Sequence, residues 1–141
     1  AWKVMAFNTM GNATPYSALR TFYYINYGGI RIESYDRHIP DKFELCQNIP
    51  NPFNPSTLIK FAIPHSQGIM GPDQKCFTIL EIHDIKGNLV SCYSFSNLAP
   101  GHYSIQWDAV DKKNRPCPNG RYLYTITSGT FIKTMKMTLL K

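Results

Sequence analysis

The segment Gln47–Pro64 (QNIPNPFNPSTLIKFAIP) places the strongest local constraint on how this chain can fold. Its closely spaced prolines each lack an N–H, fix their own φ and push the residue before them towards extended geometry. The sequence therefore predicts that Asn48–Pro55 is a stiff, exposed loop, poor in hydrogen bonds, with Phe53 as its one apolar anchor. Such a loop serves either as a recognition feature or as a turn that only orients two strands.

A strand is predicted directly after this loop. Thr57–Ile63 alternates so that Ile59, Phe61 and Ile63 share one face, which is the period of a half-buried strand. The chain contains further short alternating runs that are separated by turn residues. Their apolar positions or ranges are Phe43 and Leu45; Thr78, Leu80 and Ile82; Tyr103, Ile105 and Trp107; Arg121–Thr127; and Phe131–Leu140. This pattern predicts an all-β, seven-stranded, immunoglobulin-like (Greek-key) β-sandwich over residues 43–141.

A hairpin is predicted around the turn Asp84–Gly87, because a glycine at its end can adopt a positive φ. With a bulge at that glycine, Ile82 is expected to face Val90 and Leu80 to face Cys92. This register places Cys92 on an apolar face, as a small buried thiol.

The polar residues do not form a pattern typical of catalysis. The four histidines are scattered, and the sequence contains no nucleophile elbow, phosphate loop or paired carboxylates, so we predict neither an enzyme nor a cofactor. Asp108, Asp111 and Asn114 are weak candidates for calcium, because their spacing differs from a calcium loop and no glycine forms the turn. No C-x-x-C pair suggests zinc. Disulfides and free thiols stay open alternatives for Cys46, Cys76, Cys92 and Cys117.

The formal net charge is +6 at neutral pH. An excess of positive charge favours binding to anionic partners; the alternative is that this charge only keeps the protein soluble. The lysines and arginines are scattered, with only Lys112 and Lys113 adjacent, so a nucleic-acid interface is not predicted.

Residues 1–27 contain two strand-like runs around a turn. An aromatic-Lys-Val start, an Asn-x-x-Gly turn and a serine before the second run resemble the last two strands of a fibronectin type III domain. Two strands cannot bury a core alone, so either the rest of that domain is missing or another chain completes it by strand pairing. Residues 28–42 are predicted to be a linker, because Gly28 and Gly29 break the pattern and a polar, proline-containing stretch follows.

Five motifs in order give residues 43–141 a resemblance to the type A C-terminal sorting domain of the type IX secretion system. The opening motif (F-x-L-x-Q-N-Y-P-N-P-F-N-P-x-T-x-I-x-F) matches from Phe43 to Phe61, with Ile49 at the tyrosine position. The middle motif matches at Leu80, Ile82, Asp84, Gly87 and Val90. The third motif matches at Gly101, Trp107 and Asp108. The closing motif matches at Asn119, Gly120, Tyr122 and Tyr124. The terminal K-M-x-L-L-K is complete over Lys136–Lys141, whereas His83 and Ala109 depart from the pattern.

The resemblance implies that the domain is an address for export to the cell surface or beyond it. Such domains are read in the periplasm by a translocon, and a surface sortase then usually removes them and joins the cargo to anionic lipopolysaccharide. The implied recognition residues are Asn51, Pro52, Phe53, Asn54, Pro55, Lys136, Met137 and Lys141.

A second resemblance supports a different function. The same sandwich resembles the immunoglobulin-like domain of flagellar hook-capping proteins. The alternative is therefore a retained structural module of an extracellular fibre or adhesin, which self-associates through strand pairing of the N-terminal segment.

Overall fold

The computed structural model describes residues 32–34, 38–65, 77–96 and 98–141. Within these ranges the chain forms eight strands and no helix. The strands are β1 (Ile32–Ser34), β2 (Glu44–Leu45), β3 (Thr57–Ile63), β4 (Phe77–Asp84), β5 (Leu89–Ser96), β6 (Gly101–Trp107), β7 (Gly120–Ser128) and β8 (Phe131–Leu139). No helix in the described part of the chain could cross a membrane.

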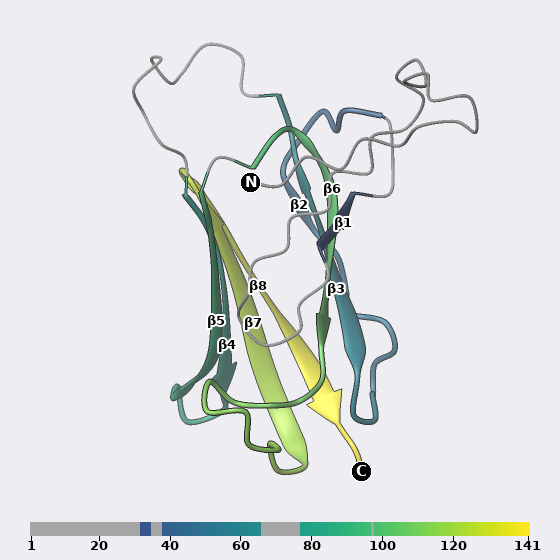
Figure 1. Cartoon of the computed structure of the whole chain (residues 1–141), viewed down its shortest axis with the longest axis vertical. Coiled ribbons are helices and arrows are strands. Elements are labelled where there is room, and N and C mark those ends of the chain that lie inside the picture. Colours follow the sequence, from purple (N-terminus) through teal and green to yellow (C-terminus); the bar gives the residue numbers. More distant parts are fainter. Residues whose placement is uncertain (1–31, 35–37, 66–76, 97) are drawn as a thin grey trace, which may run out of the picture.

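The strands form two four-stranded sheets that face each other (Figure 1). One sheet has the order β1-β6-β3-β2 and the other β5-β4-β7-β8, and every strand pair is antiparallel. The prediction of an all-β, immunoglobulin-like sandwich with seven strands over residues 43–141 is confirmed by β2 to β8. β1 comes from the segment predicted as a linker and pairs with β6. The predictions for residues 1–27 lie outside the described residues.

Alternation places one face of each long strand in a common core, as the sequence predicts. Ile59, Phe61 and Ile63 of β3 are buried, and the predicted inward residues of β4 and β6 are buried as well. Trp107 lies between Phe53 and Tyr122, with ring centroids 5.6 and 5.4 Å apart. Burying these aromatic and branched side chains supplies the main driving force for the sandwich.

Two buried tyrosines also tie loops to the sheets. The Tyr103 hydroxyl donates to the Ala99 carbonyl, and the Tyr122 hydroxyl donates to the Pro118 carbonyl at 2.6 Å. Each bond reaches back four residues, as in the tyrosine corner of immunoglobulin-like domains. Both tyrosines therefore have a structural role.

The predicted register of the β4–β5 hairpin is wrong by one residue. Leu80 faces Tyr93 and Ile82 faces Ser91, with a register shift between Ile82 and His83. The turn itself closes as predicted, with the Asp84 N–H donating to the Asn88 carbonyl, and the shift arises after it, where Val90 is an extra residue between the His83–Leu89 and Ile82–Ser91 pairs. Since a one-residue shift moves every side chain to the other face, Cys92 is exposed and not buried.

Candidate recognition surface

The proline loop, Asn48–Pro55, lies along the outer edge of the C-terminal strand β8. The Phe53 N–H donates to the Thr138 carbonyl, and the Phe53 carbonyl accepts from the Leu140 N–H, both at 3.0 Å. This makes Phe53 and Leu139 a parallel bridge. The Asn51 side-chain oxygen accepts from the Thr138 N–H, also at 3.0 Å. The loop therefore covers part of an edge that β8 would otherwise present unpaired.

A buried polar network holds the loop from beneath. The Asn48 side-chain amide donates to the Pro50 carbonyl and to the Thr57 hydroxyl, both at 3.0 Å, and that hydroxyl donates to the same carbonyl at 2.9 Å. The prediction of a hydrogen-bond-poor loop is wrong, because Asn48 and Thr57 replace the donors that the prolines lack. The peptide bonds before Pro50 and Pro52 are cis.

Tyr124 of β7 connects this network to the second sheet. Its hydroxyl accepts from the Asn48 N–H at 2.9 Å and donates to the Cys46 carbonyl at 2.8 Å. Burial raises the pKa of Tyr124 to about 12, and the hydrogen bond from Asn48 acts in the opposite direction. The neutral hydroxyl thus serves as donor and acceptor for two backbone groups at once.

The eight predicted recognition residues fall into two groups. Six are exposed: Asn51, Pro52, Asn54, Pro55, Lys136 and Lys141. Phe53 and Met137 are only 2% and 1% exposed. Their side chains belong to the core, so they can contribute to recognition only by holding the exposed residues in place.

Gln47 and Lys141 complete this surface with three further hydrogen bonds, none of which a sequence motif predicts. The Gln47 side chain donates to the Lys136 carbonyl at 2.9 Å. Lys141 is fixed by its own N–H, which donates to the Asn119 side-chain oxygen at 3.0 Å, and by its ammonium, which donates to the Cys117 carbonyl at 2.7 Å. Beside Gln47 lies an open groove of about 310 Å³, lined by Gln47, Leu123, Thr134, Met135 and Lys136.

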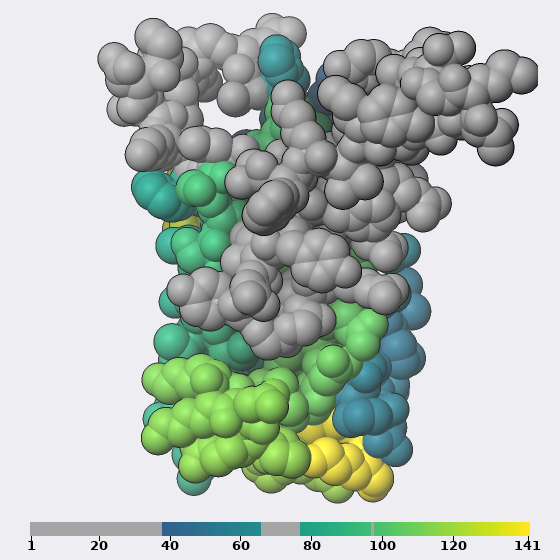
Figure 2. Space-filling view, viewed as in Figure 1, coloured from purple at the N-terminus to yellow at the C-terminus, as the bar shows by residue number. Residues whose placement is uncertain are grey.

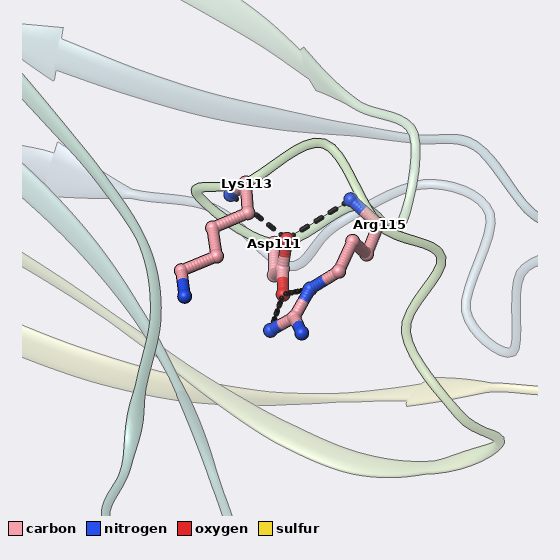
Figure 3. A network of polar contacts seen from close by, with 3 residues as sticks. All are labelled: Asp111, Lys113 and Arg115. Atoms are coloured by element: carbon pink, nitrogen blue, oxygen red, sulfur yellow. Dashed lines mark hydrogen bonds and ion pairs between the residues drawn. The ribbon is translucent and has the colours of Figure 1, made fainter.

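The two acidic calcium candidates, Asp108 and Asp111, accept hydrogen bonds from groups of the protein. One oxygen of Asp111 accepts from the N–H groups of Lys113 and Arg115, and the other accepts from the Arg115 guanidinium (Figure 3). Asp108 accepts from the side chains of Ser56 and Gln106, at 2.7 Å each. No group of three or more possible metal ligands among His, Cys, Asp and Glu occurs in the described ranges.

Three of the four cysteines lie in the described residues, and all three are free thiols. Cys117 is buried, Cys46 is half-buried and Cys92 is exposed. Burial raises the pKa of each of them, which keeps them in the thiol form.

Comparison with known proteins supports the immunoglobulin-like fold. The family model of the FlgD Ig-like domain matches residues 69–130. Dimeric latent PorU from Porphyromonas gingivalis is similar in structure, with a TM-score of 0.51 and 23% identity, over 77% of this chain and 10% of PorU. At this identity the likeness shows the fold alone. This chain corresponds to about a tenth of that protein.

Two other solved structures have lower scores. PorZ from P. gingivalis, described as a surface component of the type IX secretion system, has a TM-score of 0.44 and 16% identity, over 72% of this chain and 12% of PorZ. The DNA glycosylase AlkC from Pseudomonas fluorescens has a TM-score of 0.45 and 14% identity, over 70% of this chain and 30% of AlkC. No curated protein matches.

Proposed function

We propose that residues 43–141 are a C-terminal sorting domain that directs an upstream cargo through the type IX secretion system to the cell surface or outside. The domain then acts by being bound, first by the translocon and later by the surface sortase, and not by catalysis. In this proposal residues 1–27 are the end of a fibronectin type III-like domain, and residues 28–42 link it to the sorting domain.

The observation that carries this proposal is the contact between the two motifs singled out in the sequence. The proline loop and the terminal segment Lys136–Lys141 are more than 80 residues apart, yet Phe53 and Asn51 bind the β8 backbone directly. A receptor could therefore read both motifs as one rigid surface. Their hydrogen bonds to each other and to Tyr124 keep that surface in a single geometry, which lowers the entropic cost of binding.

The proposal is tested by export of a passenger fused ahead of the whole chain, in a host with the type IX system. Deleting Lys136–Lys141 is expected to trap the passenger in the periplasm, but it also removes part of β8. The sharper variant is Asn54→Ala with Pro55→Ala and Lys136→Glu, since these three side chains are exposed. Lys42→Glu is the matched control, because Lys42 is exposed and lies before β2.

We expect the triple variant to stay in the periplasm while the control variant reaches the surface. Circular dichroism and the thermal midpoint of each purified variant show whether its fold is intact. Normal export of a folded triple variant would overturn the proposed recognition surface. Normal export of the deletion variant would overturn the sorting function itself.

One observation favours the alternative, a retained structural module of an extracellular fibre or adhesin. The FlgD Ig-like family model matches residues 69–130, a region that does not depend on the proline loop or on the terminal motif. Intact mass and N-terminal sequencing of the native protein separate the two functions. A mass near 16.1 kDa with a start at Ala1 would support a processed subunit. A much larger mass, from one longer polypeptide that includes this chain, would support an exported cargo that keeps its sorting domain.

A further inference from the structure

One end of the sandwich collects six of the nine exposed lysines and arginines in the described part of the chain. The turn between β4 and β5, the loop between β6 and β7 and the C-terminus all lie at this end (Figure 1). The Lys112 N–H donates to the Val90 carbonyl at 2.9 Å, which attaches the long loop to the start of β5. The light green surface of this loop forms much of that end (Figure 2). The exposed cations here are Lys86, Lys112, Lys113, Arg115, Arg121 and Lys141.

The carboxylates at the same end are engaged by other groups. Asp84 accepts from the N–H groups of Lys86 and Asn88 and from the Asn88 side chain, at 2.8 to 2.9 Å. Asp111 is held in the same way by its own turn, and Asp108 accepts from two neutral side chains. Among the described residues of this end, Arg115 with Asp111 is the one ion pair.

Lys113 shows how these turns present their lysines. Its backbone N–H binds Asp111, while its side chain extends away from that carboxylate (Figure 3). Lys86 takes the corresponding position in the turn Asp84–Asn88, where its N–H binds Asp84. The carboxylate thus fixes the backbone of each turn, and the side chains of both lysines are exposed.

An exposed aliphatic side chain lies among these cations. Ile85, next to Lys86 at the tip of the turn, is 72% exposed, the highest value among the large hydrophobic residues of the described chain. Leu140, next to Lys141, is 53% exposed. Exposed aliphatic side chains among lysines fit the interface of an anionic lipid layer, where the ammonium groups meet phosphates and the aliphatic group enters the headgroup region.

We propose that this basic end docks on a membrane surface that contains anionic lipids. Ile85 enters the interface, and Lys86, Lys112 and Lys113 contact lipid phosphates. The function can be tested separately from recognition by a translocon, because Ile85, Lys86, Lys112 and Lys113 lie outside the proline loop and the terminal motif, whereas Leu140 and Lys141 belong to both surfaces. A soluble polyanion would be attracted by the same lysines but would gain little from Ile85, so the isoleucine favours a lipid surface.

The test is co-sedimentation of the full chain with phosphatidylcholine vesicles, with and without phosphatidylglycerol. We expect binding only to the anionic vesicles, decreasing with salt. Ile85→Ser and, separately, Lys112→Ala with Lys113→Ala are each expected to weaken binding about tenfold. Ile132→Ser and Lys42→Ala are matched controls that should bind as the unmodified chain does, because Ile132 is 66% exposed on β8 and Lys42 is exposed outside this end.

Three results would overturn the proposal. The first is an absence of binding to anionic vesicles at low salt. The second is equal weakening by the control variants, which would indicate attraction by overall charge alone. The third is a folded Ile85→Ser variant that binds vesicles normally while the lysine variant loses binding to vesicles and to dextran sulfate alike. That result would identify a site for soluble polyanions.

Discussion

Phe53 and Leu139 form a parallel bridge in a domain whose strand pairs are otherwise antiparallel. The bridge joins the proline loop to the last strand, and the Phe53 ring packs against Trp107 at a centroid distance of 5.6 Å. One residue thus connects the proline loop, the C-terminal strand and the centre of the core. Four predictions follow from this arrangement and from the turns around it.

Phe53→Ala is expected to destabilise the domain by about 3–5 kcal/mol, because it removes a side chain that is 2% exposed and leaves a cavity beside Trp107. The change in the free energy of unfolding is measured by urea denaturation. Asn54→Ala, at the exposed neighbouring position, is the control and should stay within about 0.5 kcal/mol of the unmodified chain. Equal effects of the two substitutions would contradict the role of Phe53 as the anchor of the loop.

Tyr124→Phe is expected to cost about 1–3 kcal/mol at neutral pH, because the Asn48 N–H and the Cys46 carbonyl lose their partner. The same substitution should change the response to alkali. Burial raises the pKa of Tyr124 from 10.0 to about 12, so the stability that it contributes is complete below pH 10 and is lost as the pH rises through 12.

Unfolding midpoints of the two proteins measured towards pH 12 test this effect. Burial also raises the pKa of Tyr93 and Tyr122, so the Tyr124→Phe protein should keep part of its alkaline sensitivity. If the two proteins lose stability in parallel, the hydroxyl of Tyr124 does not contribute as we describe.

Asp111→Asn is expected to reduce the sensitivity of the domain to acid. The hydrogen bond from the Arg115 side chain is the largest effect that lowers the pKa of Asp111 from 3.8 to about 2. A group with a lowered pKa contributes stability above its unfolded value, and this stability is lost as the pH falls from 3.8 through 2. Urea midpoints measured across this range should converge for the two proteins at the acid end. A constant difference between them would argue against the carboxylate as the titrating group.

Substitutions at the fourth residue of the turns Asp84–Asn88 and Asp111–Arg115 are expected to have opposite effects on the stability of the domain. Gly87 has a φ of 84° and Asn114 a φ of 59°, in the left-handed region where a side chain with Cβ is strained. Gly87→Ala meets no atom within 4 Å and should cost about 1 kcal/mol from backbone strain alone. Asn114→Gly should be neutral or stabilising by a few tenths of a kcal/mol. A destabilising Asn114→Gly would mean that the asparagine side chain itself supports the turn.

The alternation of apolar residues was sufficient to predict the sandwich from the sequence. Ile59, Phe61 and Ile63, or Tyr103, Ile105 and Trp107, share a face because successive side chains of a strand point in opposite directions. This period is local, so it does not depend on which strands become neighbours. The motifs likewise predicted, one by one, the residues that we propose for recognition.

The pairing of distant segments was decided only by the tertiary structure. The hairpin register shifts by one residue at Val90, after the turn, and this places Cys92 at the surface. The bridge between Phe53 and Leu139, and the bonds from Asn51 and Gln47 to β8, join residues more than 80 positions apart. Backbone groups of a strand edge bind whichever donors and acceptors the fold brings to them, and no residue type marks that choice in the sequence. The sequence by itself therefore determined which side chains face the core. The packing of the two sheets determined which exposed residues lie together on one surface.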